Sequence, residues 1–430
     1  MMNRSVIVCS TFKPEPAASH AMVKSCADAS SDKEKKEKRT VVTVGIIEDC
    51  AGLGTALAAA KNHVKLTPVP RRINIKVKHL YSSESNSKLR DLLKQRYGLK
   101  KVAADACKIP GCLKAVKEKL NLVVYMNGSP CQPWSKQGDG NGLADSRSHP
   151  LKASVKFVKK HRPDVIVYEQ VKAFQHQPHV AVKRHLIKKL KEIKWTKPGK
   201  NVKNREKCCL YHLKEAILTT SKIGSVGCRR APPQERERFF LVGLKKTCTF
   251  LKKFKFPKQK PLRPGSLEKL LRLSRESMLE AEQEPTSATA VRNWQWIRDD
   301  WNENSSGPEI GGYSIVDLHS SQRFGVHFMN GTCPTITKAR CGSSAFWLVY
   351  RDSKDTFLKR KLSVDEYGLL QGWPRREVKK MLSLCDKQGV MSRAELGQAF
   401  GNGFSFNVVQ SMVGDLIDLA VEDTLERQGA

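Results

Sequence analysis

Residues Gly128-Ser129-Pro130-Cys131-Gln132-Pro133-Trp134-Ser135 follow an apolar run, 122–126, that is short and β-branched enough to predict a buried strand. The polar, glycine-rich residues 136–141 come next and predict a mobile loop. A cysteine held between prolines at the end of a central strand is well placed to act as a nucleophile, because the prolines restrict the backbone around it. The alternative is a structural cysteine in a tight turn.

A strand, a glycine turn and a helix are predicted near the start of the chain. The run 41–47 predicts a strand that leads into Cys50-Ala51-Gly52-Leu53-Gly54, and residues 56–60 favour a helix. Glycines at this point let the backbone approach a ligand at the helix N-terminus. The third glycine of a dinucleotide fingerprint is missing, which argues against NAD.

Carboxylates recur at the ends of expected strands. Glu84 follows the strand expected at 73–80, Asp105 ends the one at 102–105, and Glu169 lies near the end of the one at 163–171. An acid after the second strand can accept hydrogen bonds from ribose hydroxyls, although a solvated Glu84 is the alternative. These repeated units predict an α/β fold with a doubly wound, mostly parallel sheet and a site at the carboxyl ends of its strands.

The chain is strongly basic, with a formal net charge of +35 over 430 residues. Residues 1–40 hold 8 basic and 5 acidic side chains, so +32 belongs to residues 41–430. Such a surface attracts polyanions, above all nucleic acid, although a basic protein with no such partner is the alternative. No apolar run approaches the length of a membrane span, and the sequence contains no CxxC pair, so we expect neither a membrane nor a metal.

Two basic stretches stand out. Residues 183–207 carry 11 basic and 2 acidic side chains, partly on an expected helix whose exposed face either tracks phosphates or is merely solvated. Residues 245–263 carry eight basic side chains and no acidic one, and Pro257, Pro261 and the following Pro264 interrupt the stretch, which predicts a linker out of the first domain.

In this order and spacing, these segments resemble the cytosine carbon-5 DNA methyltransferases over about residues 42–415. The matching motifs are Ala51-Gly52-Leu53-Gly54, Pro130-Cys131-Gln132 followed by Asp145 and Arg147, Glu169-Gln170-Val171, the alternating Gln234, Arg236 and Arg238 directly before a strand expected at 239–243, Leu370-Gln371-Gly372-Trp373-Pro374, and Gly401-Asn402.

The resemblance implies a methyltransferase fold, S-adenosylmethionine as cofactor and double-stranded DNA as partner, with the protein acting as a monomer on DNA. It implies methylation of a flipped-out cytosine through a covalent adduct. The implied catalytic residues are Cys131, Glu169, Arg236 and Arg238; the cofactor-binding residues are Cys50, Ala51, Gly52, Leu53, Gly54, Glu84, Asp105, Pro130 and Asn402; the DNA-binding residues are Gln132, Ser135 and Gln234. We expect Arg236 and Arg238 to bind the O2 oxygen of the base, and the surrounding positive charge to ionise Cys131 near neutral pH.

The resemblance also implies a division of the chain. It implies a catalytic domain at 41–250, a smaller inserted target-recognition domain at 251–340, and a return to the catalytic domain at 341–430. The composition of residues 1–40 itself predicts a disordered tail, and the apolar run 346–350 predicts that the main sheet resumes there. The basic segment 33–39 either directs the protein to the nucleus or is solvated, and the start of the tail also has the composition of an organelle transit peptide.

Four residues depart from the family pattern: Cys50 and Gln170 replace Phe and Asn, Trp134 replaces Phe, and Phe404 stands where the residue is usually smaller. Gln170 raises the question of how firmly the Pro130–Cys131 loop is braced. Two alternatives remain open. One is an RNA methyltransferase on the same scaffold, although the Cys-Phe-Thr element of that branch is missing; the other is a catalytically silent DNA-binding or chromatin protein.

Overall fold

The computed structural model describes residues 39–111, 113, 120–134, 142–196, 207–226, 231–320, 327–353 and 355–429. The chain divides into two compact units, residues 1–38 and 39–430, and all described residues belong to the second. The expected disordered tail and targeting segment, up to residue 38, lie outside the described residues, as do Ser135 and the expected mobile loop at 136–141.

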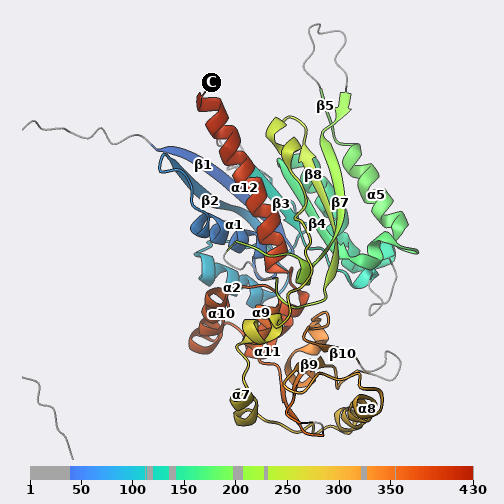
Figure 1. The fold of residues 1–430 in the computed structure, drawn as a ribbon. Coiled ribbons are helices and arrows are strands. Elements are labelled where there is room, and N and C mark those ends of the chain that lie inside the picture. The colour runs from blue at the N-terminus through green and yellow to red at the C-terminus, as the bar shows by residue number, and fades with distance from the viewer. Residues whose placement is uncertain are drawn as a thin grey trace, which may run out of the picture. The chain divides into compact units, whose positions relative to one another are not determined.

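A six-stranded sheet, in the order β2-β1-β3-β4-β8-β7, organises the second unit (Figure 1). Its strands are β1 (Thr40–Asp49), β2 (Ile73–Ser83), β3 (Leu122–Asn127), β4 (Val165–Val171), β7 (Tyr211–Thr219) and β8 (Glu237–Lys245). The first four strands run parallel, whereas β8 is antiparallel to both β4 and β7. This confirms the predicted α/β fold with a mostly parallel sheet.

Side chains of the main sheet enter two hydrophobic cores, because successive residues of a strand point to opposite faces. Val124 packs in the core that includes residues of α1 (Thr55–Leu66) and α12 (Phe406–Gly429). Its neighbour Tyr125 packs in the core that includes residues of α4 (His149–His161) and α5 (Val180–Lys191). Helices therefore cover both faces, as a doubly wound sheet requires.

A second sheet is antiparallel, with the order β10-β9-β11-β12. It is formed by β9 (Tyr313–Val316), β10 (Phe328–Asn330), β11 (Trp347–Arg351) and β12 (Phe357–Lys361), and it shares a core with α8 (Ala288–Asn304). The expectation that residues 346–350 rejoin the main sheet is wrong, since β11 pairs with β9 and β12. A short apolar run predicts a strand without specifying its partners. The domain boundaries stay predictions, with the small sheet continuing past residue 340.

Two further expectations need correction. Residues 102–105 form no regular strand; Ala103 makes a single bridge to Ser83 at the end of β2. The stretch 245–263 is not a free linker, because Phe250 and Leu251 are buried in the core. Gln259 also bonds to β7, accepting from Thr219 N at 2.9 Å.

The remaining helices and strands that the structure describes include a third, two-stranded antiparallel sheet, β5-β6. They are α2 (Ser87–Tyr97), β5 (Lys194–Thr196), β6 (Lys207–Cys209), α6 (Ser266–Leu271), α7 (Arg275–Glu280), α9 (Val364–Leu370), α10 (Arg375–Gln388) and α11 (Arg393–Asn402). No single helix in the described ranges is long and apolar enough to cross a membrane; α11 and α12, bent by 57° at their break, pass that test only as a pair.

Candidate active site

The turn between β1 and α1 contains three residues with positive φ: Cys50 (54°), Gly52 (53°) and Gly54 (70°). A Cβ atom added at Gly52 would meet nothing within 4 Å, so the space beside this residue is open. Ala51 and Leu53 are buried and anchor the turn in the cores. The turn thus leaves backbone accessible at Gly52, as a ligand-approaching glycine loop requires.

Glu48 holds the start of α1, a role that the sequence did not reveal. Its carboxylate accepts hydrogen bonds from Ala56 N at 2.7 Å and Leu57 N at 3.2 Å. Burial raises the pKa of Glu48 to about 7, although these bonds and the nearby Arg96 lower it. Capping residues are normally sought immediately before a helix, whereas Glu48 lies on the preceding strand and reaches the helix across the turn.

Glu84 lies beside the same turn, as the sequence predicts. Its Oε2 accepts a hydrogen bond from Gly52 N at 2.8 Å and its Oε1 one from Asn86 N at 3.0 Å. Each oxygen keeps a second lone pair that can accept a further hydrogen bond. Burial raises the pKa of the Cys50 thiol, and the charges of Asp49, Glu84 and Asp105 are among the further causes. The carboxylates at 84 and 105 therefore both act on this turn.

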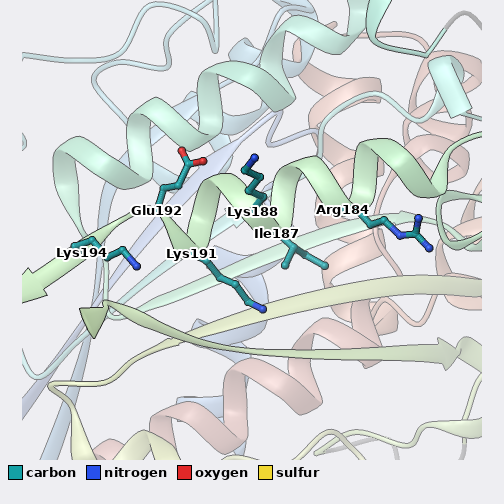
Figure 2. Close-up of a pocket in the computed structure, with 6 residues that line it drawn as sticks. All are labelled: Arg184, Ile187, Lys188, Lys191, Glu192 and Lys194. Carbon is teal, nitrogen blue, oxygen red and sulfur yellow. The ribbon is translucent and has the colours of Figure 1, made fainter. Parts of the chain in front are cut away.

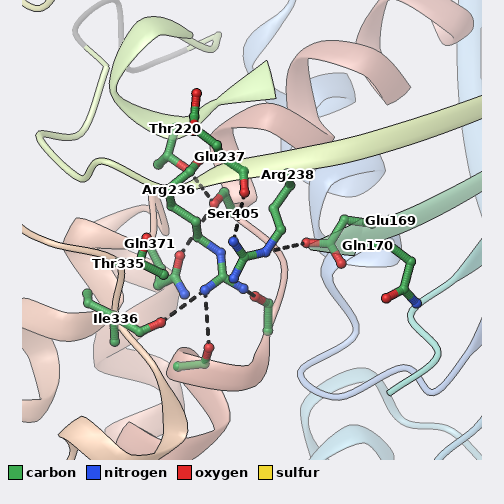
Figure 3. A network of polar contacts seen from close by, with 12 residues as sticks. Glu169, Gln170, Thr220, Arg236, Glu237, Arg238, Thr335, Ile336, Gln371 and Ser405 are labelled. Carbon is green, nitrogen blue, oxygen red and sulfur yellow. Dashed lines mark hydrogen bonds and ion pairs between the residues drawn. The ribbon is translucent and has the colours of Figure 1, made fainter. Parts of the chain in front are cut away.

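The candidate nucleophile and its partners come from neighbouring strand ends. β3 and β4 pair in parallel as far as Asn127 and Tyr168, so Cys131 and Glu169 follow from the same edge of the sheet. From β8, Arg238 Nε approaches Glu169 Oε1 to 3.2 Å (Figure 3). The charges of Arg238 and Glu169 both act on the Cys131 thiol. Thiol, carboxyl and guanidinium thus form one cluster.

The expectation that positive charge ionises Cys131 near neutral pH is wrong for the protein alone. Burial raises the pKa of the Cys131 thiol, and the opposing effects of Arg238 and Arg236 do not compensate, while Glu169 raises it further. Burial also raises the pKa of Glu169, against the lowering effects of Arg238 and Arg236. Charge could be counted in the sequence, but burial could not.

We therefore expect alkylation of Cys131 by iodoacetamide to reach its half-maximal rate at a higher pH than alkylation of N-acetylcysteine, because only the thiolate reacts. Arg238→Ala should move this midpoint higher still, since it removes the largest influence that lowers the pKa of this thiol. The measurement is the alkylation rate of the Cys131 peptide by mass spectrometry from about pH 6 to about pH 10. A midpoint at or below that of N-acetylcysteine would contradict the expectation.

Arg236 does not take the expected place at the base. Its Nη1 donates to Ile336 O at 2.9 Å and to Gly401 O at 3.3 Å, and its Nη2 donates to Gly403 O at 2.8 Å (Figure 3). Burial and the neighbouring Arg238 lower the pKa of Arg236 to about 9, so the group still carries its charge at neutral pH. Arg236 thus braces the backbone on both sides of Asn402.

Gln234 is also corrected, because it is fully buried and donates from Nε2 to Leu370 O at 3.1 Å. This removes it from the expected DNA contacts. Of the three alternating residues Gln234, Arg236 and Arg238, only Arg238 belongs to β8, which begins at Glu237, so alternation does not give the three side chains a common role.

Gln170 braces the nucleophile loop despite its departure from the family pattern. Its Nε2 donates to Ser129 O at 2.9 Å, directly before Pro130 and Cys131. Gln132 follows in a short 3-10 turn, Gln132–Trp134, and is partly exposed. Asn402, the expected cofactor residue of the C-terminal segment, is exposed at the end of α11.

Among the described residues, no group of three or more His, Cys, Asp or Glu side chains is placed to hold a metal ion. The site is therefore described by its thiol, its carboxyl groups and its arginines.

Comparison with solved structures gives the fold class. S. pombe Dnmt2 methyltransferase matches with a TM-score of 0.52 and 13% identity, over 87% of this chain and 98% of that one. The Entamoeba histolytica methyltransferase EhMeth matches with a TM-score of 0.51 and 14% identity, over 89% and 99%. The fold is that of the S-adenosylmethionine-dependent methyltransferases.

Comparison with sequences gives the family. The model of the C-5 cytosine-specific DNA methylase family matches residues 47–418, and the chain belongs to this family. The Type II methyltransferase M.MthTI of Methanothermobacter thermautotrophicus is 26% identical over 138 residues, which are 32% of this chain and 34% of that protein. The match thus spans about a third of that relative's length.

Proposed function

We propose that this protein transfers a methyl group from S-adenosylmethionine to carbon 5 of cytosine in double-stranded DNA, through a covalent bond to Cys131. The observation that carries the proposal is the cluster at the ends of β3, β4 and β8. There Arg238 Nε lies 3.2 Å from Glu169 Oε1, and both groups act on the Cys131 thiol.

Carbon 5 of cytosine is a poor nucleophile, so the ring must first be activated. The Cys131 thiolate adds to carbon 6, the Glu169 carboxyl gives its proton to ring nitrogen N3, and Arg238 binds the O2 oxygen. S-adenosylmethionine, when bound, supplies an electrophilic methyl group to carbon 5 and leaves as S-adenosylhomocysteine. Loss of the carbon-5 proton to solvent and return of the N3 proton to Glu169 then expel Cys131 as the thiolate.

The protonation states at the site are consistent with this sequence of steps. Burial raises the pKa of Glu169, so its carboxyl more readily holds the proton that N3 must receive. The thiol of Cys131 must lose its proton to solvent before it attacks, and Arg238 is the largest of the influences that favour this loss by lowering its pKa.

For the cofactor, the residues around the first turn fit the parts of S-adenosylmethionine. The open side of Gly52 suits the methionine part, and Glu84 beside it suits the ribose hydroxyls. Asp105 would receive the adenine amino group, and Asn402 would approach from the segment that Arg236 braces.

A stacked base cannot reach Cys131, so the target must be flipped out of the helix, at the cost of unstacking and unpairing. Positive charge offsets this cost by binding phosphates. Besides the total of +35, a row of exposed side chains at Arg184, Lys188 and Lys191 follows α5 toward Lys194 (Figure 2). These residues line an open hollow of about 410 Å³, with Glu192 as its acidic member.

We expect affinity for duplex DNA to fall steeply with salt, with a log–log slope of about −0.9 for each phosphate contacted. In Lys188→Glu/Lys191→Glu the slope should become shallower by about 2, because two phosphate contacts are lost. The matched control Lys188→Arg/Lys191→Arg keeps both charges and should keep the slope. Fluorescence anisotropy from about 50 to about 200 mM salt measures it; a flat response in the unaltered protein would contradict the expectation.

The test of the proposed function is methyl transfer from labelled S-adenosylmethionine to duplex DNA and, in parallel, to transfer RNA. Incorporation into carbon 5 of cytosine in DNA supports the proposal. Incorporation into RNA alone would assign the chain to an RNA substrate, and incorporation into neither would favour a catalytically silent binding protein.

A further inference from the structure

Asp49 is a buried carboxylate to which the proposed chemistry assigns no role. It accepts hydrogen bonds from Ser83 Oγ at 2.6 Å and from Tyr125 Oη at 2.7 Å, one on each oxygen. Burial raises the pKa of Asp49, against the lowering effect of these two bonds. Burying an acid is costly, so its presence here calls for a role beyond packing.

On one side, Asp49 is linked to the nucleophile loop. Asn127 Nδ2 donates to Tyr125 Oη at 3.2 Å, and Asn127 Oδ1 accepts from Ser129 N at 3.1 Å and from the Ser129 hydroxyl. The Ser129 carbonyl accepts from Gln170 Nε2 at 2.9 Å. Ser129 is two residues before Cys131, so the position of this loop depends on the same bonds.

On the other side, Asp49 is linked to the turn that begins at Cys50. The Ser83 hydroxyl, which donates to Asp49, accepts from Cys50 N at 3.4 Å, and the Ser83 carbonyl accepts from Ala51 N at 2.9 Å. A backbone hydrogen bond also connects the two segments directly, because Gly128 N donates to Asp49 O at 3.0 Å. One continuous chain of hydrogen bonds therefore joins the turn to the loop.

The side chains that form these hydrogen bonds are shielded from water, and their donors converge on Asp49 from both sides. These side chains, Asp49, Ser83, Tyr125, Asn127, Ser129 and Gln170, are no more than 4% exposed. From Asn127 and from Ser83, the donors point toward the Asp49 carboxylate, so successive bonds polarise one another. The Tyr125 ring is fixed by stacking on Phe157, with centroids 4.8 Å apart.

We propose that Asp49 and Tyr125 are positioning residues that couple the two halves of the site, so that a ligand on the turn Cys50–Gly54 changes the reactivity of Cys131. The coupling rests on the proposed function for the identity of that ligand. It makes the nucleophile respond to the cofactor before any nucleic acid is bound.

The test measures the rate at which iodoacetamide alkylates Cys131 with and without saturating S-adenosylhomocysteine, in the full chain. In the wild type the ligand should change this rate by at least about fivefold, the lower end of common coupling between sites. In Tyr125→Phe, which keeps the ring and removes the hydroxyl at the centre of the chain, the ratio should fall toward one.

Tyr168→Phe is the matched control, since Tyr168 is an equally buried tyrosine on β4 whose hydroxyl contacts Ser154 Oγ at 3.0 Å, outside the chain. It should keep the wild-type ratio. Should Tyr125→Phe not fold, Ser83→Ala interrupts the same chain on the cofactor side and should give the same loss.

The outcomes separate this proposal from the proposed function. If the wild type binds S-adenosylhomocysteine but its Cys131 rate is unchanged, or if Tyr125→Phe keeps the full ratio, the coupling is refuted and the methyl-transfer proposal stands. If calorimetry detects no binding of S-adenosylhomocysteine to the wild type, the proposed function falls and the coupling falls with it.

Discussion

Cys131→Ser is expected to lower methyl transfer to duplex DNA by at least about a thousandfold, because loss of a covalent nucleophile removes most of the catalysis that depends on it. A serine hydroxyl is a far weaker acid than a thiol, so Arg238 cannot lower its pKa far enough for it to attack carbon 6 as an alkoxide. The variant should fold, since oxygen replaces sulfur at a position that is only partly buried.

The same variant should fail to form a denaturant-stable adduct with duplex DNA that carries 5-fluorocytosine, whereas the wild type should form one. Cys107→Ser, which changes an exposed thiol, is the control and should keep both activity and adduct. Equal incorporation of label by the wild type and Cys131→Ser would refute the mechanism, and an active wild type without an adduct would refute the assignment of the nucleophile.

Arg236→Ala should have the largest effect on stability, lowering the free energy of unfolding by about 3 kcal/mol. The change leaves the carbonyls of Ile336, Gly401 and Gly403 without their charged donor in a buried place. Because the carbonyls of Gly401 and Gly403 flank Asn402, affinity for S-adenosylhomocysteine should fall as well. Urea unfolding and calorimetry measure the two effects.

Arg238→Ala is the matched comparison, and it should affect methyl transfer more than stability. Activity should be lost because the base oxygen loses its donor, while stability should fall less than in Arg236→Ala, since Glu169 can take up a proton when its partner is gone. If Arg238→Ala were the more destabilising of the two, the division of roles between these arginines would be wrong.

The sequence predicted those parts of the candidate site that follow directly from the end of a predicted strand. The β-branched runs before Cys50, Cys131 and Glu169 predict strands, and the carboxyl ends of parallel neighbours meet at one edge. The structure has these strands adjacent as β1, β3 and β4. The sequence alone therefore predicted that the turn at Cys50, the thiol of Cys131 and the carboxyl group of Glu169 lie along one edge of the sheet.

Roles that depend on distant partners could not be predicted. Arg236 and Arg238 are two residues apart, yet one braces carbonyls 100 to 167 positions further along the chain and the other pairs with Glu169. A local pattern carries no information on which distant backbone a side chain will meet. For the same reason, the sequence did not show that β11 pairs with β9 or that Gln234 donates to Leu370 O.

By itself, the sequence determined the fold class, the order of the strands along the chain, and the thiol, carboxyl and guanidinium that meet at their ends. Only the tertiary structure decided that burial raises the pKa of the Cys131 thiol, that Arg236 braces distant backbone carbonyls, and that Asp49 and Tyr125 join the two loops. The physical reason is that secondary structure follows from neighbouring residues, whereas burial, and with it every shifted pKa and every buried hydrogen bond, exists only once distant segments have packed together.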